Sequence, residues 1–233
     1  MVSFKEFRRK CYPDSVWNSG AVDKRHIYRP LGLWFTKLLL PTGIHPNYLT
    51  YFMIILAICA AALFVVAQTW SYFLAIIFVF LFQILDCTDG QIARYRNICT
   101  KRGWFIDLVH EAIAFPLILF GIGLGVFYKH WNLIYLYAGS LAAIFWLMAD
   151  YTRHSFERIL FESGKHPDHI TVTGKIKSKL FYLTYGNFNT VFMYLILLSI
   201  IFNTMHYLII FLALSLIIRF IVQVLVLMNY IDW

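Results

Sequence analysis

The chain contains several long stretches in which no side chain carries a charge. Between Asn47 and Ala67 there is no Lys, Arg, Asp, Glu or His, and a helix needs about 20 apolar residues to cross a bilayer. Hydrophobic residues make up 61% of the 233-residue chain and charged residues only 14%, which lies outside the usual composition of soluble domains. The chain is therefore predicted to be an all-α integral membrane protein.

Further apolar runs bring the number of predicted transmembrane helices to six. The run from Trp70 to Leu85 would span only about 24 Å as a helix. Because the hydrocarbon layer is roughly 30 Å thick, this helix is expected to continue through Asp86 and Asp89. The other predicted spans cover residues 103–127, 131–149, about 188–202 and 207–231, with a very short turn before the last. Six spans use almost the whole chain, so residues 1–233 are predicted to form a single membrane-embedded domain.

Lys and Arg are unevenly distributed among the loops of this layout. They are concentrated in the leader, residues 1–46, and in the loops after the second and fourth spans, whereas the opposite side has only Lys129. Cytosolic loops are enriched in Lys and Arg, so both termini are predicted to be cytosolic. The net charge of +8 is assigned to this orientation and to anionic headgroups or phosphorylated substrates, and nucleic-acid binding is not expected.

The leader also carries apolar residues at helical spacing. They predict an amphipathic helix that lies on the membrane surface, and they are Ile27, Leu31, Trp34, Phe35, Leu38 and Leu39. Residues 1–46 are therefore expected to form a cytosolic leader with an interfacial helix.

Four carboxylates flank the loop between the second and third predicted spans. A helix turns about 100° per residue, so two sets of side chains share a face: Asp86, Asp89, Gly90 and Ala93 on the second helix, and Gly103, Asp107 and Glu111 on the third. The two helices are expected to be antiparallel neighbours, which lets all four carboxylates converge near the cytosolic end. Ionised carboxylates there repel one another and are costly to bury. A divalent cation would neutralise them, and oxygen ligands beside a phosphate favour Mg²⁺ or Mn²⁺.

Two neighbouring features receive structural interpretations. His110 points about 100° away from Glu111 on the predicted third helix, so helix packing or solvent contact is favoured over a catalytic role. The glycines at residues 121–125 mimic part of a dinucleotide loop but lie inside a predicted membrane helix, where close helix packing explains them better. Gly139 and Ala143 are spaced for similar contact, either within one bundle or between two.

The acidic segment resembles the signature of the CDP-alcohol phosphotransferase (CDP-alcohol phosphatidyltransferase) family. That signature reads Asp-x2-Asp-Gly-x2-Ala-Arg, then a gap, then Gly-x3-Asp-x3-Asp. The matching residues are Asp86, Asp89, Gly90, Ala93, Arg94, Gly103 and Asp107. Glu111 stands where the family has its fourth Asp, so its side chain reaches about 1.5 Å further, enough to alter a spaced site. The resemblance extends to residues 46–50 at the start of the first span, the leader helix and the six-span layout.

The resemblance implies metal-dependent transfer of a substituted phosphate from a CDP-alcohol to an acceptor hydroxyl, with release of CMP. The implied metal ligands are Asp86, Asp89 and Asp107, with Glu111 contributing, and the ion is Mg²⁺ or Mn²⁺. The implied nucleotide-binding residues are Asp86, Gly90, Ala93, Arg94 and Gly103. Glu111 is the implied general base for the acceptor hydroxyl, which attacks the phosphorus distal to cytidine. We therefore expect a homodimeric enzyme of phospholipid or polar-headgroup synthesis among membrane lipids.

Two arginines are candidates for binding an acceptor phosphate. Arg219 lies at mid-depth in the sixth predicted span, where an unpaired charge is costly. It is interpreted either as an acceptor site or as the partner of a carboxylate, backbone carbonyls or a lipid headgroup. Arg153, at the cytosolic end of the fourth predicted span, is the second candidate.

Other functions would also place acids in a membrane helix. The main alternative is a cation or proton transporter that uses the same acidic cluster. A transporter needs access from both faces, whereas these acids gather at one end with little polar character beyond them. A UbiA-type prenyltransferase also uses acids and magnesium, but its Asn-Asp-x2-Asp signature is missing here.

Overall fold

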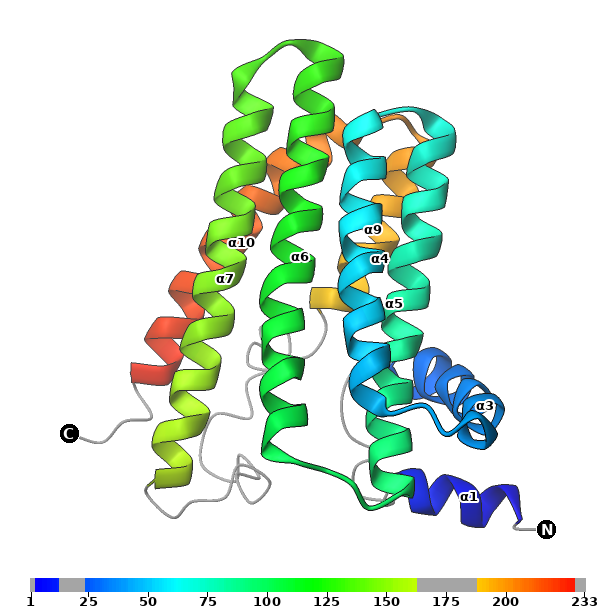
Figure 1. Ribbon diagram of the computed structural model, residues 1–233. Coiled ribbons are helices and arrows are strands. Elements are labelled where there is room, and N and C mark those ends of the chain that lie inside the picture. The colour runs from blue at the N-terminus through cyan, green and yellow to red at the C-terminus, as the bar shows by residue number, and fades with distance from the viewer. Residues whose placement is uncertain (1–2, 13–23, 163–187, 229–233) are drawn as a thin grey trace. The chain divides into compact units, whose positions relative to one another are not determined.

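The computed structural model describes residues 3–12, 24–162 and 188–228, and every regular element in these ranges is a helix (Figure 1). The chain forms two compact units, residues 1–118 and 119–233. Helix α6 (Lys101–His130) contributes its first part to the first unit and its last part to the second. The all-α prediction is confirmed for the described residues, and the single membrane domain stays a prediction.

The first unit is built on a hairpin of two long helices, α4 (Pro46–Val66) and α5 (Thr69–Tyr95). They lie side by side in Figure 1 and pack along much of their length. Pro46 occupies the first turn of α4, where its missing N–H costs no hydrogen bond, and the His45 ring accepts a hydrogen bond from the Asn47 N–H at 3.2 Å. The chain reverses at Ala67, which has φ 57°. The first predicted span is therefore confirmed to within a residue at each end.

Helix α5 has 27 residues and continues well past Leu85. The predicted extension through Asp86 and Asp89 is confirmed, and the helix ends only at Tyr95. Asp86 and Asp89 therefore both lie in regular helix, where their spacing determines the direction of each side chain.

The leader contains α1 (Phe4–Cys11), a π-helical turn η1 (Lys24–Tyr28), α3 (Arg29–Leu39) and a short 3-10 turn η2 (Leu40–Thr42). Helix α3 packs against α5, and its buried residues are Arg29, Gly32, Leu33 and Thr36. Leu33 belongs to an apolar cluster with Phe7, Cys11 and Tyr12. A Cβ atom at Gly32 would lie 3.1 Å from Cys87 Cβ, so the missing side chain allows the close approach. The predicted apolar stripe lies elsewhere on α3: Trp34 is 63% and Leu38 71% exposed.

Five of the described helices are long and apolar enough to cross a membrane: α4, α5, α6, residues 133–156 of α7, and α10. The predicted fifth span corresponds to α9 (Phe188–Ile201), whose 14 residues are fewer than the roughly 17 that a spanning helix needs. Residues 163–187, which precede it, lie outside the described part of the chain. The described residues therefore provide five candidate spans rather than the expected six.

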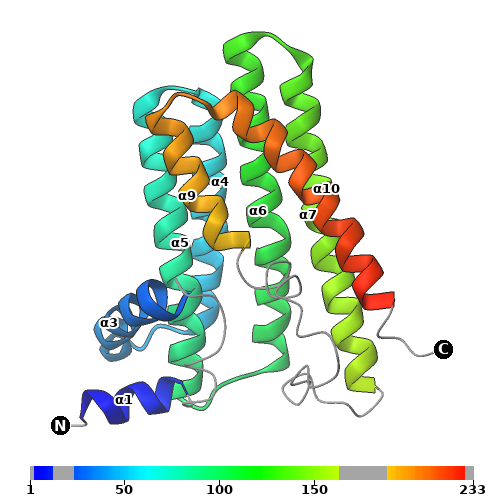
Figure 2. The same ribbon diagram turned by 180° about the vertical axis from the view of Figure 1, so that it is seen from behind.

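The second unit contains α7 (Leu133–Glu162), α9 and α10 (Met205–Met228). Helix α7 runs 13 residues beyond its expected end at Ala149. Helix α10 packs along α7 (Figure 2), and the buried Gln223 amide donates hydrogen bonds to the Ala149 carbonyl oxygen at 2.7 Å and to Thr152 Oγ1 at 2.9 Å. This polar contact fixes how the two helices are aligned.

Gly123 of α6 and Gly139 of α7 bring these helices into backbone contact. A Cβ atom at Gly123 would lie only 2.6 Å from Gly139 Cα and 2.8 Å from the Tyr135 carbonyl oxygen. Close helix packing, the interpretation given to these glycines, is confirmed, and for Gly139 the contact lies within one chain.

Gly123→Ala tests this contact. In an ordinary helix this change stabilises by about 1 kcal/mol, but here the new methyl group meets backbone atoms that cannot rotate away. We expect a lower melting temperature in detergent than for the wild type. Ser140→Ala is the matched control, because it adds no atom beside the contact. A Gly123→Ala protein that melts at or above the wild-type temperature would contradict the packing.

Candidate functional site

The two halves of the acidic motif lie on the facing ends of α5 and α6. Asp86 and Asp89 are on the last turns of α5, and Asp107 and Glu111 are on the first turns of α6. Only five residues, 96–100, separate the two helices. The predicted antiparallel arrangement of these two helix ends is thus present, and it lies within the first unit.

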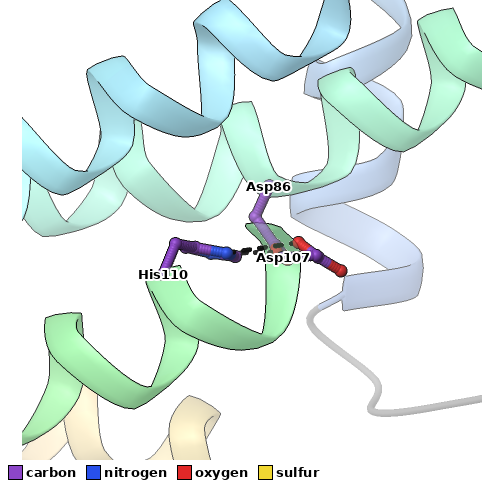
Figure 3. A group of neighbouring side chains, drawn as sticks. All are labelled: Asp86, Asp107 and His110. Atoms are coloured by element: carbon purple, nitrogen blue, oxygen red, sulfur yellow. Dashed lines mark ion pairs between the residues drawn. The ribbon is translucent and has the colours of Figure 1, made fainter. Parts of the chain in front are cut away.

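Asp86 and Asp107 meet at a histidine (Figure 3). His110 Nδ1 lies 3.2 Å from Asp107 Oδ1, and His110 Nε2 lies 3.8 Å from Asp86 Oδ1. One ligand atom from each of the three side chains falls within 4.8 Å of the other two, so the group has the dimensions of a metal site. Asp89 and Glu111 do not belong to this group, and the convergence of all four carboxylates stays a prediction.

Asp89 is buried and accepts a hydrogen bond from Thr50 Oγ1 at 2.9 Å. It also lines a cavity of about 230 Å³. Hydrogen bonding to Thr50 orients one carboxylate oxygen, and the position at the cavity wall makes the group available to a ligand.

The same cavity is bounded by residues of the α4 start, the α5 end and the α6 start. Its lining includes four of the five residues expected to bind nucleotide, Gly90, Ala93, Arg94 and Gly103, together with Asp89 and Asp107. Asp86, the fifth, is not in the lining. Small side chains on this wall leave space that larger residues would fill.

Arg94 joins the cavity to the leader. Its Nε donates a hydrogen bond to the Cys11 carbonyl oxygen at 2.6 Å, and its guanidinium lies 4.3 Å from the centre of the Tyr12 ring. A Cβ atom at Gly90 would come within 3.1 Å of this guanidinium. Gly90 therefore gives Arg94 the room to lie back along α5 while it holds the end of α1.

Lys24 of the leader forms an ion pair with the acidic cluster that the sequence did not predict. Its Nζ lies 3.2 Å from Asp86 Oδ2. Asp86, with a further contribution from Glu111, raises the pKa of Lys24 far above its usual value, so the lysine stays charged at neutral pH. Lys24 had been assigned to membrane orientation, and no local spacing links it to Asp86, which is 62 residues away.

His110 was expected to take part in helix packing or face solvent rather than act in catalysis. It does pack against Phe82 of α5, with ring centroids 5.4 Å apart, and it also lies in the acidic cluster. Its ring is fully buried and contacts both Asp86 and Asp107. The available signal was its spacing of three residues from Asp107, which puts both side chains on one side of a helix. The expectation considered only the angle between His110 and Glu111, and not the angle between His110 and Asp107.

The two acceptor candidates lie in the second unit. Arg153 Nη2 is 2.6 Å from Asp150 Oδ1, one turn earlier on α7. The guanidinium of Arg219 on α10 lies 5.4 Å from the centre of the Trp146 ring of α7. Both arginines thus interact with side chains of α7.

Comparison with known proteins assigns the chain to a family. The model of the CDP-alcohol phosphatidyltransferase family matches residues 43–221, more than half of the chain. The chain belongs to this family, as the acidic signature indicated.

Similarity to curated relatives is local. Cholinephosphotransferase 1 of Rattus norvegicus is 29% identical over 107 residues, which are 42% of this chain and 26% of that protein. The CDP-diacylglycerol–glycerol-3-phosphate 3-phosphatidyltransferase of Blochmanniella floridana is 37% identical over 68 residues, 29% of this chain and 36% of that protein. The matched stretches thus span about a quarter to a third of these relatives.

Similarity to solved structures extends over most of the chain. Mycobacterium tuberculosis phosphatidylinositol phosphate synthase (PgsA1) in complex with manganese and citrate has a TM-score of 0.61 at 17% identity, covering 89% of this chain and 93% of that one. The same enzyme with CDP-DAG bound has a TM-score of 0.58 at 18% identity, covering 89% and 98%. At this identity the likeness shows a shared fold.

The attachment of α1 by Arg94 makes a prediction about Cys11. Cys11 is 0% exposed, and this burial raises the pKa of its thiol to about 11, so little reactive thiolate is present near neutral pH. We expect a maleimide to label the exposed Cys99 much faster than Cys11, as followed by peptide mass spectrometry. Arg94→Ala should release α1 and accelerate Cys11 labelling by roughly tenfold or more.

Arg25→Ala is the control for this experiment, because Arg25 is an exposed leader arginine. It should leave the labelling rate of Cys11 unchanged. Equal Cys11 rates in the wild type and in Arg94→Ala would show that Arg94 does not hold α1 in place.

Proposed function

We propose that the protein transfers a substituted phosphate from a CDP-alcohol to an acceptor hydroxyl and releases CMP, in phospholipid or polar-headgroup synthesis. One observation carries this proposal: Asp107 belongs both to the ion-sized group with Asp86 and His110 and to the lining of the cavity. Asp107 could therefore contact both a divalent ion and a phosphate-containing ligand in the cavity. Membership of the family favours this transfer over ion transport.

The metal in this proposal is Mg²⁺ or Mn²⁺, held by Asp86, Asp89 and Asp107 with a contribution from Glu111. The donor set fits such an ion, because hard carboxylate oxygens predominate, and two of these carboxylates lie within ion-binding reach of each other. The manganese in the PgsA1 structure supports the same assignment. When bound, the ion neutralises negative charge on the donor pyrophosphate and on the leaving phosphate.

The nucleotide in this proposal occupies the cavity beside Gly90, Ala93 and Gly103. Without larger side chains at these positions, a flat base or a phosphate can approach the helix backbone. Arg94 adds positive charge at the cavity wall, and it is held in place by Cys11 and Tyr12. The bound CDP-DAG in the second PgsA1 structure supports a cytidine diphosphate ligand.

Glu111 is the proposed general base. It accepts the proton of the acceptor hydroxyl, whose oxygen then forms a bond to the phosphorus distal to cytidine. The bond between that phosphorus and the bridging oxygen breaks, and CMP leaves with the electron pair. Glu111 is half-buried and follows Asp107 by four residues, about one turn, on α6, which supports this role.

Arg153 and Arg219 are the proposed binding groups for an acceptor that carries a phosphate. Arg153 is oriented by its ion pair with Asp150, and Arg219 by the face of Trp146. Held guanidinium groups lose little conformational freedom when they bind an anion, which suits them to this task.

We also propose the membrane arrangement that the loop charges indicate. It has six spans, with α9 as part of the fifth, both termini and the active site on the cytosolic side, an interfacial leader helix and a homodimeric assembly. The exposed apolar stripe of α3, with Trp34 and Leu38, supports contact between the leader and the membrane surface.

Asp107→Asn tests the proposed function directly. The change keeps the shape of the side chain but removes the charge that binds the ion, so metal-dependent CMP release from a panel of CDP-alcohols and acceptors should be abolished. CMP is measured by mass spectrometry, and size-exclusion chromatography checks that the variant is folded. Glu6→Gln, which removes an exposed carboxylate of α1, should keep full activity. Full activity in folded Asp107→Asn would refute the proposal.

Variants of Glu111 test the general base. Glu111→Gln cannot accept a proton, and we expect kcat to fall by about 10²- to 10⁴-fold. Glu111→Asp restores the carboxylate of the family signature on a shorter side chain and should lose less activity. Single-turnover CMP release measures both. Wild-type activity in Glu111→Gln would exclude proton transfer by this residue.

A further inference from the structure

His110 has an environment that the proposed reaction does not explain. The ring is fully buried (0% exposed) and faces carboxylates from two helices, Asp107 of α6 and Asp86 of α5 (Figure 3). Among the described residues, neither ring nitrogen has a hydrogen-bond partner. Buried polar atoms are nearly always satisfied, so these two nitrogens point to a ligand between the ring and the carboxylates.

The charges of the cluster indicate that this ligand is a cation. A neutral imidazole has one N–H and one lone pair, so in this form one of its nitrogens presents a lone pair toward a carboxylate oxygen. The two N–H groups of an imidazolium would also lack hydrogen-bond partners within the described part of the chain. Two lone pairs that face each other in a buried site repel. A metal ion placed beside them accepts both and removes the repulsion. Lys24 Nζ contacts the other oxygen of Asp86, Oδ2, rather than the Oδ1 atom nearest His110.

The spacing of the atoms agrees with a shared ion. Two ligand atoms at about 2.1 Å from one ion and at right angles to each other lie about 3 Å apart. His110 Nδ1 and Asp107 Oδ1 are 3.2 Å apart, and a carboxylate oxygen of Asp86 lies within the same 4.8 Å group. An ion can therefore contact all three side chains with small adjustments.

From these observations we infer that His110 is a nitrogen ligand of the divalent ion that Asp86 and Asp107 hold. This inference rests on the metal-dependent function proposed above and extends its all-carboxylate ligand set. Imidazole nitrogen is a softer ligand than carboxylate oxygen, so it favours first-row transition ions over Mg²⁺. The site should therefore prefer Mn²⁺ to Mg²⁺ more strongly than carboxylates alone would.

Pulsed electron paramagnetic resonance of the Mn²⁺-loaded, full-length protein tests the inference without measuring activity. A directly bound imidazole gives ¹⁴N modulation of the Mn²⁺ electron-spin echo, and protein labelled with ¹⁵N-histidine should replace it with the ¹⁵N pattern. His110→Gln should abolish the signal and weaken Mn²⁺ binding by about tenfold or more, with a smaller effect on Mg²⁺ binding. Titration of the free Mn²⁺ signal measures the affinity.

His130→Gln is the matched control. His130 is an exposed residue at the other end of α6, 20 residues after His110. The control should keep both the nitrogen signal and the Mn²⁺ affinity. If His110→Gln does not fold, the wild-type protein with and without ¹⁵N-histidine, measured beside His130→Gln, still decides whether a histidine binds the ion.

The possible results separate this inference from the proposed function. Tight Mn²⁺ binding without ¹⁴N modulation would overturn the ligand assignment and leave the transferase intact. A nitrogen signal that survives in His110→Gln would also overturn it. A nitrogen signal that depends on His110, in a protein that releases no CMP, would support the ligand assignment and refute the transferase. Absence of any Mn²⁺ binding would refute both.

Discussion

Carboxylates held at the end of membrane helices must be neutralised, and the first unit is organised around this requirement. Transfer of an ionised group from water to the protein interior costs several kcal/mol of solvation free energy, even after the protein relaxes around it. Here the groups that face Asp86 come from separate elements: Lys24 from the leader and His110 from α6. Asp89 obtains its hydrogen bond from Thr50 of α4. The acids of α5 therefore connect this helix to the leader, α4 and α6.

The leader is part of this unit rather than an appendage. The buried Gln91 accepts a hydrogen bond from Thr36 Oγ1 at 2.7 Å and donates one to the Arg29 carbonyl oxygen at 3.1 Å. Arg96 donates to the carbonyl oxygens of Leu40 at 3.0 Å and Ile44 at 2.5 Å. The end of α5 that bears the signature thus also fixes the leader. Gln91 can do so because it follows Asp89 by two residues and therefore lies on another face of the helix. Loss of the leader contacts would also remove the ion pair between Lys24 and Asp86.

The sequence predicted those features that depend on helix geometry and bilayer thickness. The extension of α5 through Asp86 and Asp89 followed from length, and the shared cavity wall of Gly90, Ala93 and Gly103 followed from spacing. It did not predict the approach of Lys24 to Asp86, since a contact across 62 residues has no local periodicity. The packed face of α3 was also missed, because the prediction followed the apolar stripe, whereas Gly32 and Thr36 make the contact with α5.

The position of His110 gives a physical reason for the glutamate that follows it. Asp107 and His110 share one side of α6, and Glu111 lies on the other flank of Asp107, about 40° from Asp107 and about 100° from His110. The imidazole lies beside Asp86 and Asp107, and Glu111 does not belong to the group that these three side chains form. Glutamate reaches about 1.5 Å further than aspartate, which compensates for part of that separation. With the proposed base and the inferred nitrogen ligand, metal binding and proton transfer would belong to neighbouring residues of α6, His110 and Glu111.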